Sequence, residues 1–276
     1  MRHRSAVVLL LFTAVLWSLG GVLIKSVEWP SLAKAGARSL FAAAILWAWI
    51  RKPVFTFSKV QITAAIAYTG TVALFVIAND LTTAANAIFL QYTAPIYVAL
   101  LGQWVLGEKA RRIDWVCIGV ALCGIALFFR DDFDTRGAWG IAAALGSGLS
   151  FAVMVLCLRV EKDRSPATSL LLGNILTVLI AIPSALAAGL PSGKACGILA
   201  VLGIFQLGIP YVMYSISVQR VTALEAILIP MLEPILNPIW VALQRGEVPG
   251  PWSIGGAFLV LAAVGIRAVQ GKPKGT

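Results

Sequence analysis

Charged residues are scarce in this sequence, and their scarcity excludes an ordinary water-soluble globule. Only 12% of the 276 residues are Asp, Glu, Lys or Arg, whereas 59% are hydrophobic and the mean hydropathy is +0.90. A soluble domain carries about 25% charged residues. A chain of this length can bury a large core, but too few polar residues would remain to cover its outside. Most of the surface must therefore face lipid.

The residue types that perform catalysis and bind metals are also few. The single histidine, His3, lies close to the N-terminus, which excludes a Ser-His-Asp triad and any histidine-based metal site. The segment 189–195, GLPSGKA, lacks a Ser or Thr after its lysine and is too short between its glycines to be an ATP-binding phosphate loop. No CxxC pair indicates a zinc site or a disulfide framework among the cysteines Cys117, Cys123, Cys157 and Cys196. We therefore expect neither an enzyme nor a cofactor.

Apolar segments of about 18 to 23 residues recur along the chain, and a bilayer core of about 30 Å requires helices of that length. The connections between them are short, and no soluble domain fits in any of them. The sequence therefore predicts an all-α integral membrane protein with ten transmembrane helices. The expected spans are 5–27, 32–50, 60–80, 84–106, 113–129, 137–158, 167–187, 195–218, 222–243 and 252–269.

The basic residues give these spans a direction. The net charge of +10 allows nucleic-acid binding as an alternative, but the placement of the charges argues against it. If the N-terminus is cytoplasmic, the cytoplasmic loops and ends hold most of the Lys and Arg residues, as the positive-inside rule requires. We expect both termini in the cytoplasm, a bacterial inner-membrane location and no nucleic-acid partner. The outer loops would hold only Arg130, Arg136, Lys194 and Arg245.

The two halves of the sequence share a pattern. Residues 95–108, PIYVALLGQWVLGE, and 234–247, PILNPIWVALQRGE, both begin with proline and end with Gly-Glu. Upstream, AANA at 84–87 matches ALEA at 223–226 in the same register. These matches predict two copies of a five-helix unit. Because five is an odd number, the second copy enters the membrane from the opposite side, and such inverted repeats are typical of transporters.

The motifs of these repeats resemble those of the EamA-type drug/metabolite transporter superfamily, and the resemblance covers the whole chain. Within that superfamily the chain is most similar to bacterial amino-acid exporters, including the aromatic amino acid exporters. The residues that carry the resemblance are Leu16-Trp17, Pro95, Gly107-Glu108, Leu232-Glu233-Pro234 and Gly246-Glu247.

The resemblance implies a central cavity between two repeats and the efflux of small metabolites. We expect the first repeat at 1–132, the second, inverted repeat at 137–270 and a cytoplasmic tail at 271–276. The chain departs from the usual pattern at Phe151, where the second repeat often has Trp, and at the polar residues Asn237-Pro238 and Arg245 of the ninth span.

Three prolines four residues apart, Pro230, Pro234 and Pro238, interrupt the ninth span, with Glu233 and Asn237 between them. A proline inside a helix removes a backbone hydrogen bond and bends the helix. In lipid, protein groups or cavity water must satisfy the freed carbonyls. We therefore expect a bent helix whose polar face lines a cavity near the membrane midplane. Glu233 is then either a substrate or proton site, or a structural or gating carboxyl that bonds the freed backbone.

Other charged and kinked positions leave similar alternatives open. Pro95 should bend the fourth span beside Gln91 and Tyr92. Arg38, in the second span, either reaches the outer interface with its long side chain or turns inward to bind a carboxylate or an acid. Glu225, near the start of the ninth span, is expected to be a solvated carboxylate that interacts favourably with the helix dipole.

Aromatic and amide side chains within the spans are the candidate walls of the cavity. Any one of them can be ordinary packing, but together they suit an amphipathic solute, whose apolar part the rings would contact and whose polar end the amides would bind. The candidates are Trp17, Phe75, Asn79, Gln91, Tyr92, Phe151, Tyr211, Tyr214 and Asn237, with Glu233, Pro234, Pro95 and Arg38 as gating or coupling residues.

These features together predict a secondary transporter that exports small amphipathic metabolites by alternating access, without ATP hydrolysis. Amino acids, including aromatic ones, are the expected substrates. The alternatives are an exporter of another metabolite or drug class, or a membrane scaffold or sensor that transports nothing. The expected partners are the small-molecule substrate and the lipid bilayer. A monomer is expected to suffice, while the oligomeric state and proton coupling stay open.

Overall fold

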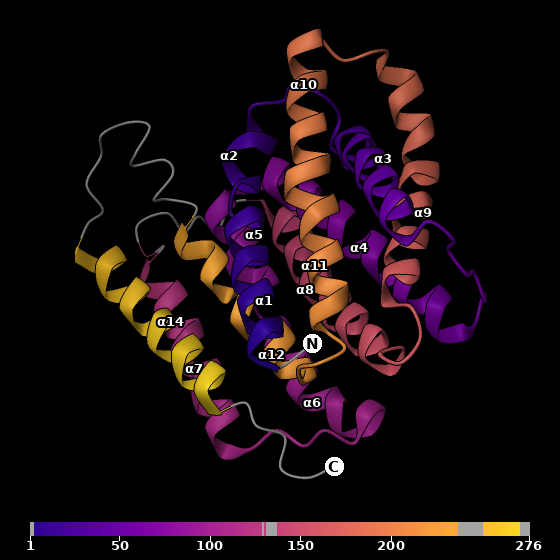
Figure 1. The fold of residues 1–276 in the computed structure, drawn as a ribbon. Coiled ribbons are helices and arrows are strands. Elements are labelled where there is room, and N and C mark those ends of the chain that lie inside the picture. The colour runs from indigo at the N-terminus through magenta and orange to yellow at the C-terminus, as the bar shows by residue number, and fades with distance from the viewer. Residues whose placement is uncertain (1–2, 129, 131–136, 237–250, 271–276) are drawn as a thin grey trace.

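A computed structural model of the chain is a bundle of helices joined by short connections (Figure 1). It describes residues 3–128, 130, 137–236 and 251–270, and this part of the chain contains no strand. In the first half the helices are α1 (His3–Trp17), α2 (Gly20–Lys25), α3 (Ser31–Ile50), α4 (Lys59–Leu81), α5 (Ala84–Gln91), α6 (Ala94–Leu106) and α7 (Arg112–Phe128). In the second half they are α8 (Ala138–Val160), α9 (Pro166–Ala188), α10 (Gly193–Val201), the π-helix η1 (Leu202–Gly208), α11 (Ile209–Ser217), α12 (Ala223–Leu228), the 3₁₀-helix η2 (Ile229–Leu232) and α14 (Pro251–Gln270).

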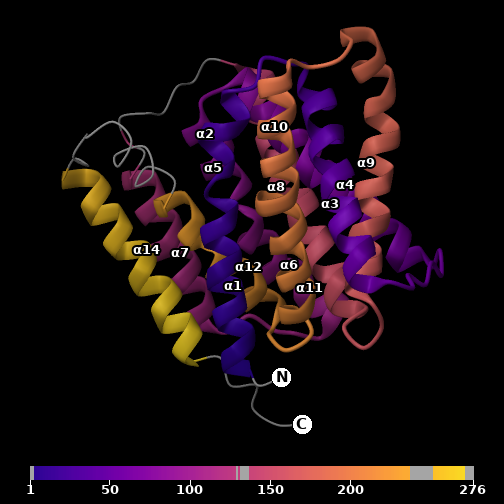
Figure 2. The ribbon, with the colours of Figure 1, turned by 45° about the horizontal axis from the view of Figure 1, so that its top comes forward.

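The helical segments run alternately between two ends of the bundle (Figures 1 and 2). α1 begins and α14 ends at what we call the proximal end, where His3 and Arg267 both contact Glu225 at the start of α12. At the opposite, distal end Lys34 in the first turn of α3 pairs with Asp80 in the last turn of α4, with 2.7 Å between Nζ and Oδ1. These contacts fix the direction of helices that are far apart in the sequence.

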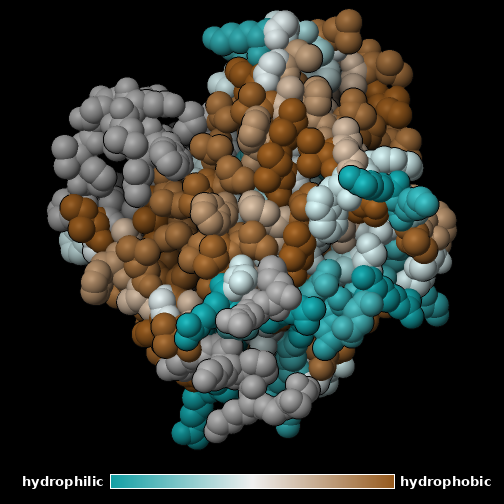
Figure 3. All heavy atoms as spheres, viewed as in Figure 1, coloured by the Kyte–Doolittle hydropathy of each residue, from teal (hydrophilic) through white to brown (hydrophobic). Residues whose placement is uncertain are grey.

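The outside of the bundle is largely apolar. Large side chains point outward, among them Trp104 (76% exposed), Leu186 (79%) and Phe258 (71%). Figure 3 shows hydrophobic residues over much of one face, whereas hydrophilic residues gather mainly towards the proximal end. Five described helical stretches are long and apolar enough to cross a membrane: Lys59–Leu81, Asn86–Leu106, Ala138–Val160, Pro166–Ala188 and Gly193–Ser217.

The two halves pack against each other reciprocally. α3 lies along α9, and α7 lies along α14, so helices in matching positions of the two halves meet. The packing of α4 on α8 has its counterpart in the packing of α11 on α1. Such reciprocal contacts fit the predicted pair of related units.

Prolines interrupt the helices where the sequence predicts bends. The predicted fourth span consists of α5 and α6, with a break between Gln91 and Ala94, and Pro95 is the second residue of α6. The predicted ninth span begins as α12, tightens into η2 at Pro230, and is helical again over 233–236. Pro95 and Pro234 are both buried. Asn237 and Pro238 lie outside the described residues.

A further irregularity, the π-helix η1, lies in the predicted eighth span. Pro210 follows it in the first turn of α11 and has no N–H to donate to the carbonyl of Gln206, four residues earlier. The helix widens to i→i+5 bonding just before the proline, so that Ile209 donates to the carbonyl of Ile204. Single π-turns of this kind occur frequently at functional sites, and η1 directs Gln206 towards the centre of the bundle.

Ionic contacts tie the helices together at the proximal end. Arg267 of α14 contacts Asp114 of α7 at 3.2 Å and Glu225 of α12 at 3.6 Å. Glu225 also closes a capping box with Thr222 and lies 3.0 Å from His3. Glu225 does mark a helix start, but the expectation of a solvated carboxylate is wrong, because it is fully buried. Its partners His3 and Arg267 are too distant in the sequence for the local pattern to reveal them.

Candidate functional site

One cavity lies near the middle of the bundle, where α1, α3, α4, α8 and α11 meet the ends of α5 and η2. Its volume is about 40 Å³, which leaves room for a few water molecules. Side chains from both halves of the chain line it: Trp17, Arg38, Thr71, Val72, Phe75, Gln91, Tyr92, Phe151, Gln206, Leu207, Tyr211 and Glu233. A solute larger than water therefore requires these walls to move apart.

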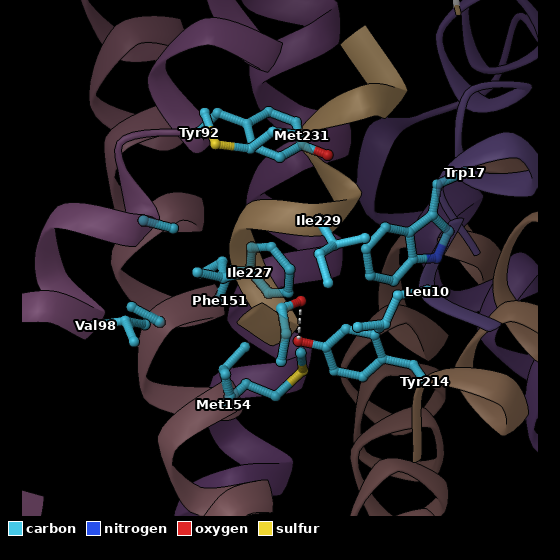
Figure 4. Close-up of a cluster of buried hydrophobic side chains, with 14 of the residues drawn as sticks. Leu10, Trp17, Tyr92, Val98, Phe151, Met154, Tyr214, Ile227, Ile229 and Met231 are labelled. Carbon is cyan, nitrogen blue, oxygen red and sulfur yellow. Dashed lines mark hydrogen bonds between the residues drawn. The ribbon is translucent and has the colours of Figure 1, made fainter. Parts of the chain in front are cut away.

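One wall of the cavity belongs to a cluster of aromatic rings around Trp17. Figure 4 shows Trp17, Phe151 and Tyr214 of this cluster among the buried hydrophobic side chains. The Trp17 ring lies 5.9 Å from Phe151 in an edge-to-face arrangement, 5.3 Å from Tyr211 and 5.5 Å from Tyr214, measured between ring centroids. Such distances are favourable for aromatic pairs. Tyr214 lies behind the wall and donates to the carbonyl of Ala226, so it supports the rings rather than facing the cavity.

A carboxyl group lies at another part of the wall, where α12 and η2 end. The hydroxyl of Tyr92 is 2.6 Å from Oε2 of Glu233 and 3.0 Å from the carbonyl of Pro230. When Glu233 is ionised, Tyr92 can donate to it. When Glu233 is protonated, it can donate to the Tyr92 oxygen while Tyr92 donates to Pro230. The geometry thus satisfies both protonation states, because the carbonyl provides a second acceptor for the tyrosine.

A cation reaches the same cavity from α3. Arg38 is 1% exposed, and its Nη2 donates to Oε1 of Gln206 at 2.7 Å. Gly203 allows η1 to approach α3 closely, because a Cβ at this position would lie 2.6 Å from the carbonyl oxygen of Arg38. The sequence left open whether Arg38 reaches the interface or turns inward, and in the structure it turns inward.

Amide and hydroxyl groups hold the remaining wall in place. Gln91 donates from Nε2 to the hydroxyl of Ser147 at 2.8 Å, and Ser147 donates to the carbonyl of Thr71 at 2.8 Å. Gly148 permits this contact, since a Cβ there would lie 2.8 Å from the carbonyl oxygen of Gln91. Asn79 does not line the cavity, and its side chain instead donates to the carbonyl of Phe75 one turn earlier.

Most of the predicted site residues meet at this cavity, but not all of them do. Tyr214 and Asn79 lie behind or beside it, Pro95 and Pro234 shape its helices without lining it, and Asn237 is outside the described residues. The residues that the structure places in the wall are Trp17, Arg38, Phe75, Gln91, Tyr92, Phe151, Tyr211 and Glu233.

Sequence reasoning missed Thr71, Val72, Gln206 and Leu207. Thr71, Val72 and Leu207 carry no signal, because small polar and aliphatic residues are common in membrane helices. Gln206 did carry one, since it is an amide four residues before a proline in an apolar span. Gln91 stands in the same relation to Pro95.

Comparisons with other proteins agree with this architecture. An uncharacterized transporter from Archaeoglobus fulgidus is 24% identical over 265 residues, which are 96% of each chain. The threonine/homoserine exporter RhtA of Escherichia coli is 27% identical over 189 residues, which are 64% of this chain and 60% of that exporter. A crystal structure superposes on 98% of this chain and 99% of its own with a TM-score of 0.80, and its 19% identity makes this a likeness of fold alone.

The sequence model of the EamA-like transporter family matches the chain twice, at residues 4–130 and at residues 138–267. The two matches together cover almost the whole sequence, one in each half. With the transporter-named relatives they indicate a multi-pass membrane transporter rather than an enzyme. The chain belongs to the EamA-like transporter family.

Proposed function

We propose that the protein is a secondary transporter that exports amino acids and similar amphipathic metabolites, aromatic ones included, by alternating access and without ATP hydrolysis. The observation that carries this proposal is the central cavity, which both halves of the chain line with an aromatic wall, a carboxyl group and a guanidinium group. Aromatic rings suit an apolar side chain, and the two charged groups suit the charged ends of a zwitterion.

The proposed topology has ten membrane spans in two repeats, residues 1–132 and the inverted 137–270, followed by a cytoplasmic tail at 271–276. The reciprocal packing of the two halves supports it, as do the separate family matches in each half. The proximal end, where α1 begins and α14 ends, is then cytoplasmic, as the distribution of basic residues predicts. We assign the protein to the bacterial inner membrane, with both termini in the cytoplasm.

Transport requires the cavity to open to each side in turn, because its present volume is too small for an amino acid. The prolines are suited to this movement, since a helix interrupted at a proline bends there more readily than an intact one. We assign Pro95 and Pro234 to the bending of the two interrupted helices. Glu233 is the coupling candidate, because its contacts with Tyr92 can satisfy it with or without a proton.

One relative in particular supports amino acids as the substrates of this protein. The similarity to a threonine/homoserine exporter supports an amino acid substrate, and the ring-lined wall extends the expected range to aromatic side chains. An exporter of another drug or metabolite class is the second candidate. A scaffold or sensor that transports nothing is the third.

Counterflow into liposomes tests the proposal. Purified protein is reconstituted into vesicles loaded with unlabelled threonine, homoserine, phenylalanine or tryptophan, and the uptake of the corresponding labelled amino acid is followed with and without a pH gradient. We expect at least one of these amino acids to accumulate transiently above the level in protein-free vesicles. If no common amino acid exchanges, the substrate is of another class, and if amines, sugars and nucleosides do not exchange either, the protein is not a transporter.

A further inference from the structure

The guanidinium group of Arg38 is a buried cation without an acidic partner. Of its three nitrogens, Nη2 donates to the neutral amide oxygen of Gln206, while Nε and Nη1 have no hydrogen-bond partner among the described residues. No acid of the described residues forms an ion pair with it. A buried charge is ordinarily paired and fully hydrogen-bonded, since an uncompensated one is strongly unfavourable. Arg38 therefore lacks the anion that its surroundings require.

Among the described residues, two other buried cations do have acidic partners. Lys34, one turn earlier on α3, is also buried, and it has an acid in Asp80 at 2.7 Å. Arg267, buried at the proximal end, contacts Asp114 and Glu225. Each of these two buried cations thus has an acid from another helix. Of these three described cations, Arg38 is the one that faces the cavity, where an amide is its partner.

A second unsatisfied donor lies in the same cavity wall. The indole Nε1 of Trp17 is buried and has no hydrogen-bond partner in the part of the chain that the structure describes. Trp17 and Arg38 both line the cavity, and both their unused groups are N–H donors. A carboxylate is the group that such donors recognise best, because it accepts two parallel bonds from a guanidinium and has further lone pairs for another donor.

We propose that Arg38 is the subsite that binds the substrate's carboxylate, with Gln206 holding the guanidinium in position. This inference rests on the proposed function and narrows its substrate class to solutes with a free carboxylate. Glu233 lines the same cavity, where its partner is the Tyr92 hydroxyl, so its carboxylate can face the substrate's ammonium group. Amino acids should then be accepted, while their amides and esters, which lack the carboxylate, should be rejected.

A matched set of probes and variants tests the subsite. Labelled L-threonine and L-phenylalanine are compared with threoninamide and phenylalaninamide in counterflow, in the wild type, Arg38→Met and the control Arg164→Met, whose arginine is exposed. The wild type and the control should transport the amino acid about tenfold or more faster than its amide, because the amide cannot form the charge-assisted pair with Arg38. Arg38→Met should lose that preference and transport the acids about tenfold more slowly.

Thermal stability separates a binding role from a structural one. In detergent and without solute, Arg38→Met should melt no lower than the wild type, because the substitution removes a buried charge that has no counter-ion. Saturating L-threonine or L-phenylalanine should raise the melting temperature of the wild type, but not that of Arg38→Met. A variant that melts well below the wild type and still responds to the amino acids would make Arg38 structural and overturn the subsite.

The two proposals can fail separately. An Arg38→Met variant that keeps the wild-type preference for acid over amide overturns the subsite and leaves transport intact. A wild type that exchanges neither acid nor amide overturns the proposed function. In that case the changes in melting temperature test whether Arg38 binds the carboxylate. If neither amino acid raises the melting temperature of the wild type, the subsite is rejected as well.

Discussion

The Glu233→Gln variant is expected to export amino acids about ten- to a hundredfold more slowly than the wild type while inserting into the membrane normally. Glutamine keeps an acceptor for the Tyr92 hydroxyl, which lies 2.6 Å from Glu233, but it can neither carry a proton nor attract an ammonium group. Hydrogen bonds to charged groups are worth about 1.5–3 kcal/mol, and such a loss corresponds to the expected decrease in rate. Initial rates of counterflow in liposomes measure it.

A control variant distinguishes the loss of the Glu233 carboxylate from the loss of any carboxylate. Glu28→Gln makes the same change at an exposed position between α2 and α3 and should transport as the wild type does. If Glu233 couples transport to protons, the variant should also lose the stimulation by a pH gradient. Wild-type flux in Glu233→Gln would show that its carboxyl serves only the interrupted helix, where Tyr92 and the carbonyl of Pro230 surround it.

The Trp17→Ala variant should lose transport to a similar extent, for a different reason. Trp17 contacts three of the rings that form or support the wall, so its truncation removes the centre of the aromatic cluster. Replacing a buried Trp or Phe by Ala costs about 3–5 kcal/mol in protein cores, and part of that loss should appear as a lower melting temperature. Counterflow of phenylalanine should fall more than that of threonine, because an aromatic side chain depends more on the wall.

Two further variants test whether the aromatic ring of Trp17 is the cause of this result. Trp17→Phe retains a ring and should recover most of the phenylalanine transport. Trp104→Ala removes a ring that is 76% exposed on α6 and should leave both substrates unaffected. If Trp17→Ala transports phenylalanine and threonine at wild-type rates, the aromatic cluster is packing and not a substrate wall.

The coarse architecture was predictable from the sequence because the hydrophobic effect and backbone chemistry determine it locally. Long apolar segments require helices, and the helices are interrupted beside Pro95, at the start of α6, and at Pro230, in η2, as the sequence predicts. The polar, charged and aromatic residues within the predicted spans were also good candidates for the cavity. Eight of them line it, among them Trp17 and Glu233.

What the sequence left open depends on contacts between distant segments. The direction of Arg38 is determined by η1, which brings Gln206 within 2.7 Å of the guanidinium, and a widened turn has no clear single-sequence signature. Glu225 was expected in solvent, yet it is buried between His3 and Arg267, which come from the two ends of the chain. Pro210, which follows η1, indicates an irregular helix near Gln206 but does not by itself predict a π-turn.

Alternating access through this cavity is the central claim, and labelling of a single cysteine tests it most directly. Thr71 lines the cavity, and its hydroxyl donates to the carbonyl of Ala67 in its own helix. Thr71→Cys is therefore a conservative change, and it keeps the backbone carbonyl that accepts from Ser147. In a background without Cys117, Cys123, Cys157 and Cys196, this cysteine is exposed to a membrane-impermeant thiol reagent from either side of oriented vesicles. The account predicts labelling from both sides, slowed by saturating amino acid. Labelling from one side alone, or from neither, would contradict it.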